Sequence, residues 1–210
     1  MLDAATTIAI STRAPARGHV RVLAARELPL FREHLLRLDR ESRRDRFNGS
    51  LDDEWVARYA EKSVNTGTVI LVYFEDGIVR GAAELHQADL STDSLPEIAF
   101  SVEAIVRRKG VGSILFTKLI AKAQSMGYTK LRITTGAQND AMRALANKFG
   151  AHLSFRHGES TGTIDLRDPM GAGVAPQPKT SALDVARAVA DYNRAYWGLW
   201  LKLAGWGKSS

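Results

Sequence analysis

The fold of this chain is decided by one stretch, Glu97-Ile98-Ala99-Phe100-Ser101-Val102-Glu103 followed after three residues by Arg107-Arg108-Lys109-Gly110-Val111-Gly112-Ser113. Its first part alternates apolar and other residues, which predicts a half-buried strand with Ile98, Phe100 and Val102 on one face. A basic turn with two glycines follows. Beyond it, apolar residues recur every three or four positions and predict a helix that ends at Gly127. The basic turn is therefore expected at a helix N-terminus.

A helix N-terminus suits an anion, because its first N–H groups have no partner within the helix and carry the positive end of the helix dipole. Gly110 and Gly112 would let a phosphate approach the backbone closely, and the cations at 107–109 add positive charge. The turn lacks the third glycine of the dinucleotide fingerprint and the Gly-Lys-Ser/Thr of a P-loop. Two interpretations stay open at this point, a phosphate loop and a plain connection between strand and helix.

The region after this helix narrows the choice. Lys130 to Thr135 alternates as a second strand, and Asn139 opens a further helix that ends before Gly150. The pattern Arg-x-x-Gly-x-Gly between strand and helix, followed by a strand and an Asn-capped helix, resembles the Gcn5-related N-acetyltransferase (GNAT) superfamily over roughly residues 20 to 167. The resemblance implies an α/β fold with a mixed, mostly antiparallel twisted sheet of about six to seven strands and helices on both faces.

The resemblance also implies a donor and a site. The donor would be acetyl-CoA as co-substrate, without a metal, and its pyrophosphate would lie on the turn. The cofactor-binding residues would then be Phe100, Ser101, Val102, Arg107, Arg108, Lys109, Gly110, Val111, Gly112, Ser113 and Asn139. The backbone near Phe100 to Val102 would pair with the pantetheine arm and supply an N–H for the developing oxyanion. Asn139 can reach the same arm and is equally a good helix N-cap.

Glu97 matches by position the general base of the histone-acetylating branch, whose strand likewise reads Glu-Ile-x-Phe. The alternative is a carboxylate in a surface salt bridge. Many members of the superfamily have a tyrosine acid where this chain has Ala146, so the proton donor to the leaving thiolate is unassigned. Glu103, on the same alternating face, is expected to be structural.

The chain before this stretch is expected to form a strand at 19–24, helices at 27–39 and 52–64, and a hairpin of strands at 68–74 and 78–85 around Asp76-Gly77. Gly81 is expected at a bulge or a close backbone approach. The segment Glu41 to Phe47 is expected to be a solvated loop with Phe47 in the core. It is also similar to a Ser-Arg-x-x-Arg-Phe stretch of bacterial GNAT protein-lysine acetyltransferases. A closing hairpin is expected at 151–156 and 161–166.

Composition excludes several classes of function. The 210 residues contain no cysteine, so thiolate catalysis and thiolate metal sites are absent from the sequence. The five histidines show no metal-ligand spacing. The formal charge of +6 is dispersed and lacks interleaved aromatic residues, so no nucleic-acid partner is expected. No basic start is followed by an apolar run, so a signal peptide is not predicted and a cytoplasmic location is expected.

The predicted organisation is an N-terminal tail at 1–18, the GNAT domain at 19–167, a linker at 168–180 and an amphipathic helix at 181–204. Apolar residues, including Trp197 and Trp200, and a narrow charged stripe mark this last helix. It is too polar for a membrane span. We expect it to pack on its own domain or on a second subunit of a homodimer, with binding to a membrane surface or to a partner as the alternative.

The sequence thus predicts an acetyl-CoA-dependent N-acetyltransferase that works by direct attack in a ternary complex. The acceptor is expected to be a protein lysine, with a small-molecule amine as the next choice. A non-catalytic acyl-CoA-binding or scaffold protein is the alternative from another class. The segments at 40–50 and 86–95 are expected to select the acceptor.

Overall fold

The computed structural model describes residues 17–63, 66–88, 94–156 and 158–167. The predicted linker and C-terminal helix, and all but two residues of the predicted tail, lie outside these ranges. The strands are β1 (His19–Val22), β2 (Val69–Glu75), β3 (Ile78–His86), β4 (Glu97–Val102), β5 (Lys130–Gly136), β6 (His152–Arg156) and β7 (Glu159–Asp165). The α-helices are α1 (Leu28–Arg37), α2 (Arg40–Phe47), α3 (Asp53–Ser63), α4 (Val111–Ser125) and α5 (Asp140–Lys148).

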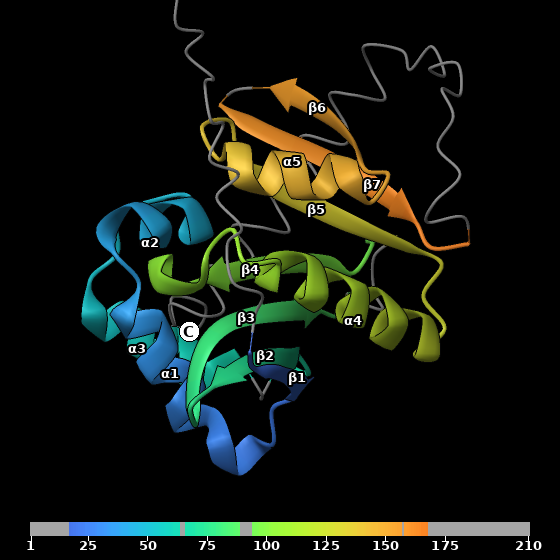
Figure 1. Ribbon diagram of the computed structural model, residues 1–210. Helices are drawn as coiled ribbons and strands as arrows, with labels where there is room; N and C mark the ends of the chain where they lie inside the picture. The colour runs from blue at the N-terminus through green and yellow to red at the C-terminus, as the bar shows by residue number, and fades with distance from the viewer. Residues whose placement is uncertain (1–16, 64–65, 89–93, 157, 168–210) are drawn as a thin grey trace, which may run out of the picture.

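All seven strands form one sheet in the order β1-β2-β3-β4-β5-β7-β6 (Figure 1). Every neighbouring pair is antiparallel except β4 and β5, which run parallel. The predicted α/β fold with a mixed, mostly antiparallel sheet is confirmed. The parallel ladder is short, because it pairs only Glu97 with Arg132 and Ile98 with Ile133. Beyond Ile98 the two strands diverge, and the sheet is open between them (Figure 1).

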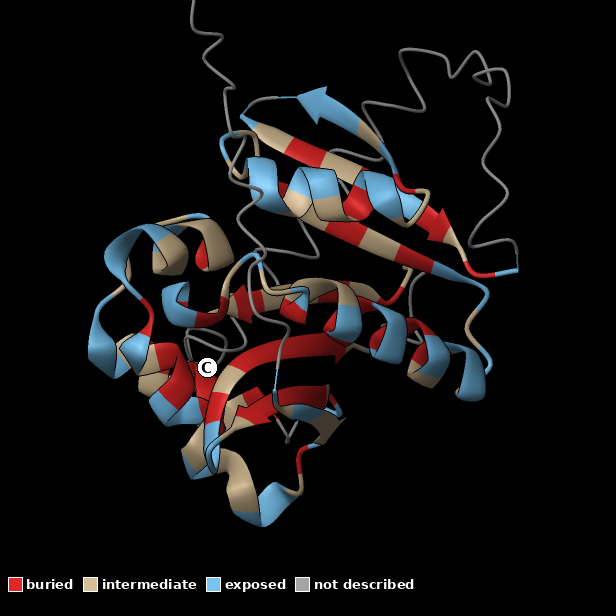
Figure 2. Cartoon of the chain, in the orientation of Figure 1, coloured by how far each residue is buried: buried red, intermediate tan, exposed pale blue. Residues whose placement is uncertain are grey.

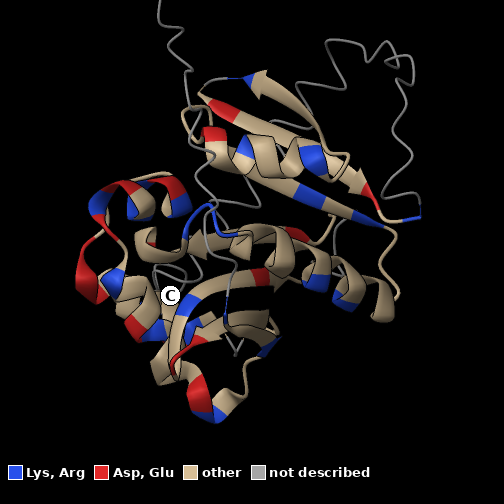
Figure 3. Cartoon of the chain, viewed as in Figure 1, with Lys and Arg blue, Asp and Glu red and all other residues tan. Residues whose placement is uncertain are grey.

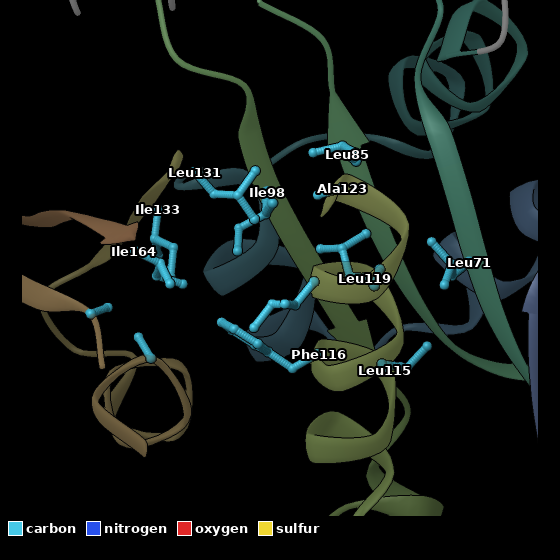
Figure 4. Close-up of a cluster of buried hydrophobic side chains, with 14 of the residues drawn as sticks. Leu71, Leu85, Ile98, Leu115, Phe116, Leu119, Ala123, Leu131, Ile133 and Ile164 are labelled. Carbon is cyan, nitrogen blue, oxygen red and sulfur yellow. The ribbon is translucent and has the colours of Figure 1, made fainter. Parts of the chain in front are cut away.

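Helices cover the sheet on both faces. A large core lies under α4 and α5 and includes Leu85, Ile98, Leu119, Leu131 and Ile164, which come from both sides of the opening (Figure 4). A second core joins α1, α2 and α3 to the other face of β2 and β3. Burial is concentrated in the central strands and on the sheet-facing sides of the helices (Figure 2). The two faces of the sheet therefore have separate cores.

Two glycine positions show why the β2–β3 hairpin folds as predicted. Asp76 and Gly77 both have positive φ, as a tight two-residue hairpin turn of the favoured hand requires. Gly81 lies where helix α4 crosses the hairpin, and a Cβ there would be 3.2 Å from Leu115 and 3.3 Å from Val111. The pairing of β2 and β3 also shifts register beside it. The sequence left open a bulge or a close approach, and both occur.

The prediction of a solvated loop at 41–47 is wrong, because Arg40–Phe47 forms helix α2. Asp39 caps its first turn by accepting a hydrogen bond from the Ser42 backbone N–H, and Asn48 ends it in the left-handed region. Hydrophobic periodicity gave no signal, since Phe47 alone is a buried apolar residue here. Capping residues, rather than an apolar stripe, mark this helix in the sequence.

Candidate active site

The opening between β4 and β5 exposes one edge of β4. Glu103 N–H donates to Arg80 O on the β3 side, whereas Pro96 O accepts from Arg132 N on the β5 side. Main-chain groups alternate along a strand, so the N–H and C=O of Phe100 and the N–H of Val102 point toward the opening. Those of Ser101 point toward its ladder partner Ala82. A chain lying along β4 could therefore pair with Phe100 and Val102 as an extra strand would.

The N-terminus of α4 lies at the far end of this edge. Gly110 has φ of +87° and precedes the helix, and a side chain at Gly110 would meet nothing within 4 Å. The first helical N–H groups, of Val111, Gly112 and Ser113, come before the first intrahelical bond from Ile114 N–H to Gly110 O. The basic turn leads into this helix beside α2 (Figure 3). The predicted loop residues 107–113 thus surround one helix N-terminus.

Arg107 is held differently from its neighbours in the turn. Its Nε donates to Val102 O at 3.1 Å, and its guanidinium contacts Asp39 at 3.3 Å and the Ser42 hydroxyl, at the first turn of α2. Arg108 and Lys109 form no ion pair within the described part of the chain. Lys148 of α5, which the sequence reasoning did not single out, reaches Ser113 Oγ at 3.1 Å and brings a further cation to the helix start.

Glu97 lies where the ladder between β4 and β5 ends, opposite Arg132 and His86. Its side chain is on the face covered by α1, α2 and α3. Burial raises the pKa of the Glu97 carboxyl, while the Thr134 hydroxyl, Arg132 and Arg46 act in the opposite direction. Within the described ranges, Glu97 forms no ion pair at 4 Å or less. A partly buried carboxylate of raised pKa is suited to accept a proton near neutral pH.

Ser101 and Glu103 belong to a buried chain of polar groups on this same face. His34 of α1 is fully buried, with Nε2 at 2.8 Å from Ser101 Oγ and Nδ1 at 3.1 Å from Glu103 Oε1. A neutral imidazole protonated on Nδ1 satisfies both contacts, and burial lowers the pKa of His34. Arg37 and Arg80 also donate to Glu103. Ser101 is only 6 % exposed, and its side chain joins β4 to α1.

A second buried polar network joins α2 and α3 to β3. Glu84 of β3 is fully buried and pairs with Arg46 of α2 at 2.6 Å, and the Tyr59 hydroxyl donates to Glu84 at 2.6 Å. Burial alone would raise the pKa of Glu84, but the adjacent Arg46 guanidinium holds it below its ordinary value. Glu84 lies opposite Ala99, two residues from Glu97 on the neighbouring strand. Arg46 therefore compensates one carboxylate and lies close enough to influence a second.

Asn139 caps α5 by accepting a hydrogen bond from Met142 N–H at 2.9 Å. Its side-chain NH₂ is left for another partner, so the structural role and the predicted contact with a pantetheine arm are compatible. Ala146 is fully buried in the core beneath α5. No side chain from that position can donate a proton to a leaving thiolate.

Several residues of this site were not predicted, namely His34, Asn48, Tyr59, Glu84, Thr134, Lys148 and Glu159. Most of their contacts join residues that are 25 to 111 positions apart along the chain. Local patterns carry no information about such pairs. A charged residue inside an otherwise apolar strand, as at Glu84, was the one available signal.

A protein-family model described as the acetyltransferase (GNAT) family matches residues 32–151, which is more than half of the chain. The chain belongs to the GNAT acetyltransferase family. This GNAT protein is accordingly an acyl-CoA N-acyltransferase of the acetyltransferase type. A comparison with curated protein sequences finds no match.

Solved structures share the GNAT fold at low sequence identity. The GNAT domain of S. lividans PAT is 19% identical, with a TM-score of 0.60, and the match covers 70% of this chain and 90% of that one. The yncA acetyltransferase from Salmonella typhimurium, solved with acetyl-CoA, is 18% identical with a TM-score of 0.53, covering 77% and 98%. The paia N-acetyltransferase from Thermoplasma acidophilum, solved with coenzyme A, is 16% identical with a TM-score of 0.54, covering 70% and 98%.

The described ranges contain neither a membrane-spanning helix nor a cluster of metal ligands. No helix in them is long and apolar enough to cross a membrane. Those ranges also contain no group of three His, Cys, Asp or Glu side chains arranged to hold a metal ion.

Proposed function

We propose that this protein transfers the acetyl group of acetyl-CoA to a primary amine by direct attack in a ternary complex, with Glu97 as general base. One observation carries the proposal. The free edge of β4 begins after Ile98, two residues from Glu97 at the nearest, and leads to the α4 N-terminus with its basic turn. An acyl-CoA laid along that edge has its pyrophosphate at the helix start and its thioester beside the carboxylate.

The donor is held mainly by main-chain groups. The N–H groups of Val111, Gly112 and Ser113 face the pyrophosphate, and Arg108 and Lys109 add positive charge. The pantetheine amides pair with Phe100 and Val102 as a further strand would. This arrangement requires that Gly110 and Gly112 carry no side chain, because the pyrophosphate lies against their backbone. The protein itself leaves room at both positions, since a Cβ there would have no neighbour closer than 3.5 Å.

The chemistry requires a neutral amine. A lysine amine has a pKa of about 10.4, so forming the nucleophile at pH 7 costs roughly 4 to 5 kcal/mol, and a base that removes the proton lowers this barrier. Glu97 takes the proton directly or through water while the nitrogen attacks the thioester carbon. The oxyanion is stabilised by a strand N–H near Phe100, and the C–S bond then breaks to release the CoA thiolate. The thiolate takes its proton without an assigned side-chain acid.

A protein lysine is the proposed acceptor, with a small-molecule amine as the alternative. The resemblance of the segment at 42–47 to protein-lysine acetyltransferases supports the first. In the structure this segment is helix α2, which lies against both β4 and β5 beside Glu97. This position supports the proposal that α2 borders the acceptor.

The substitution Glu97→Gln tests the catalytic role. We expect the transfer rate to fall about 100-fold or more, because a general base contributes roughly 10² to 10⁴ in rate, while acetyl-CoA binding is unchanged. The wild-type rate should also rise with pH through the raised pKa of Glu97, because only the ionised carboxylate accepts a proton. This limb of the pH profile should disappear in the variant. An unchanged rate would remove Glu97 from the mechanism.

The measurement combines calorimetry with acetyl-CoA and CoA, and thiol release with a panel of amines and lysine peptides. Binding with acceptor-dependent thiol release supports an acetyltransferase. Binding without turnover for any acceptor favours the acyl-CoA-binding scaffold. The substitution Glu61→Gln, which removes an exposed carboxylate on α3, is the control for a general change of charge.

A further inference from the structure

A cavity of about 290 Å³ lies between the end of α1, helix α2 and the segment that joins α2 to α3. Its volume is close to the lower end of the range for small-molecule sites, roughly 300 to 1,000 Å³. Side chains of both kinds line it, including Leu38, Arg40, Arg43, Arg44, Ser50 and Leu51. Ser42 and Arg46, through which α2 contacts Arg107 and Glu84, do not. The cavity is therefore separate from the proposed active site.

The three arginines share one face of α2. Arg43 and Arg44 follow Arg40 by three and four positions, so the side chains lie on neighbouring turns, with Cβ atoms about 5 to 6 Å from that of Arg40. Helix α2 carries both signs of charge (Figure 3), but its lining residues are all basic. Three guanidinium groups can thus converge on one bound group.

Arg43 is fixed in the wall of the cavity. Its side chain is 15% exposed, and its guanidinium donates to the Asp53 carboxylate and, at 2.9 Å, to Leu36 O. Its Nε is buried and has no hydrogen-bond partner among the residues that the structure describes. Because buried donors in proteins are almost always paired, this N–H favours a ligand that supplies an acceptor.

The cavity has an excess of positive charge. Arg40 and Arg44 are exposed, and neither forms an ion pair with another described residue. Asp53 pairs with Arg43, so one carboxylate opposes three guanidinium groups. Four carboxylates nearby in the sequence do not line the cavity, namely Asp39, Glu41, Asp45 and Asp52. The first and last of these accept hydrogen bonds from the first turns of α2 and α3. A dianion would balance the two remaining positive charges.

We infer that this cavity is an anion site for a phosphate monoester. Such a group carries about two negative charges at pH 7 and presents three acceptor oxygens on one phosphorus atom. Guanidinium forks from adjacent turns can converge on it, and the Ser50 hydroxyl is a further donor. A dicarboxylate has the same charge on two separate groups and fits a convergent set of donors less well. The inference does not depend on the proposed acetyl transfer.

Calorimetry on the CoA-saturated protein tests the inference, because CoA then occupies the proposed anion site at the start of α4. A free ester, glycerol 3-phosphate, is compared with glycerol. The peptide acetyl-Ala-phosphoserine-Ala-amide is compared with its unphosphorylated form. Succinate serves as the dianion with separated charges. The tighter of the two phosphate esters shows whether the phosphate comes from a small molecule or from a phosphorylated protein segment.

We expect a phosphate ester to bind and its unphosphorylated counterpart not to bind. Its Kd should rise about tenfold in Arg40→Gln and in Arg44→Gln, as expected for the loss of one charge-assisted contact. Arg44→Lys keeps the charge but loses the planar fork, and it should also weaken binding. Arg32→Gln, which removes an exposed arginine of α1 outside the cavity, should keep the wild-type Kd. Thermal unfolding verifies that each variant is folded.

Several outcomes would overturn the inference. One is the absence of binding for both phosphate esters, and another is an equal affinity for succinate. An equal loss of affinity in Arg32→Gln, or full affinity in Arg44→Lys, would mean that the esters respond to overall charge rather than to this cavity. If CoA itself does not bind, the same titrations are made without it, and the variants still locate the site.

Discussion

Glu103 shows how single residues fix the geometry behind this site. It accepts hydrogen bonds from His34, Arg37 and Arg80, which belong to α1 and β3. Burial would raise the pKa of Glu103, but these contacts lower it from 4.5 to about 2. Three partners thus outweigh the cost of burying one charge.

The lowered pKa of Glu103 makes the free energy of unfolding depend on pH. A carboxyl whose pKa is lowered in the folded state contributes stability above its unfolded value, and that stability is lost as the pH falls through the folded value. The contribution of Glu103 is therefore complete above a pH of about 5 and declines toward a pH of about 2. We expect the free energy of unfolding, measured with urea, to fall over this range. In Glu103→Gln the fall should be shallower.

The control is Glu61→Gln, in which the acid dependence of the wild type should persist, because Glu61 is an exposed carboxylate whose nearest cation, Arg32, is 3.9 Å away. An identical slope in the wild type and in Glu103→Gln would show that the buried network does not couple to folding.

Glu97 and the Arg46–Glu84 pair show which features of single residues could be predicted from the sequence. Alternation placed Glu97 on the side of the strand opposite Ile98 and Phe100, since a strand has a period of two. It could not show that Arg46 lies against Glu84, because 38 residues separate them and the contact exists only after α2 packs on the sheet. The face of the strand on which Glu97 lies could be predicted from a local pattern. Contacts between residues far apart in the sequence could not.

At the scale of elements, the start of α4 is the most exacting feature. Gly110 and Gly127 flank this helix with φ of +87° and +85°, and a side chain at either would meet nothing within 4 Å. They have the same backbone constraint at opposite ends of one helix dipole. A side chain at Gly127 would add the same backbone strain as one at Gly110 but would lie far from the helix N-terminus. A Gly127 variant therefore measures the effect of strain alone.

We expect Gly110→Glu to abolish acetyl-CoA binding, because it places bulk and negative charge at the anion site. Each 1.4 kcal/mol of repulsion should weaken the affinity for acetyl-CoA about tenfold. Gly127→Glu should lose a similar stability, about 1 to 2 kcal/mol of backbone strain, and keep its affinity. Calorimetry and thermal unfolding measure the two quantities. Retained affinity in Gly110→Glu would refute the assignment of the loop.

Most elements were predictable within a few residues because their apolar periods are clear, as in β2, where both faces are buried. Helix α2 was missed for the opposite reason. Its sequence is almost entirely charged, and its stability comes from caps at both ends and from the Arg46 and Phe47 side chains. An element that buries a charged face gives no hydrophobic signal.

At the scale of the whole molecule, the sheet is two parts joined by two ladder pairs between β4 and β5. A donor lying in the opening would supply hydrogen bonds that the sheet itself lacks. We expect acetyl-CoA to slow amide hydrogen exchange at Phe100 and Val102 as well as at the start of α4, by at least about tenfold when the ligand is in 10-fold excess over its Kd.

The same experiment with β6 provides the internal control, because exchange there should not change. Slowing confined to the α4 N-terminus would mean that the nucleotide end binds without the arm entering the opening. The mixed, mostly antiparallel sheet could be anticipated from the resemblance to the GNAT superfamily, but the length of the β4–β5 ladder could not. The ladder is set by tertiary packing, which a local sequence pattern does not record.

Arg107 has a consequence for energetics that reaches across the molecule. Its guanidinium contacts the first turn of α2, while its backbone belongs to the basic turn proposed to hold the donor's phosphates. If the donor's phosphates recruit Arg107, α2 gives up a contact on which its capping relies. Thermodynamic linkage then makes the effect reciprocal. The donor lowers the affinity of a ligand that holds α2 in place, and that ligand lowers the affinity of the donor by the same factor. Under the proposed function, one guanidinium would thus couple donor binding to the position of α2.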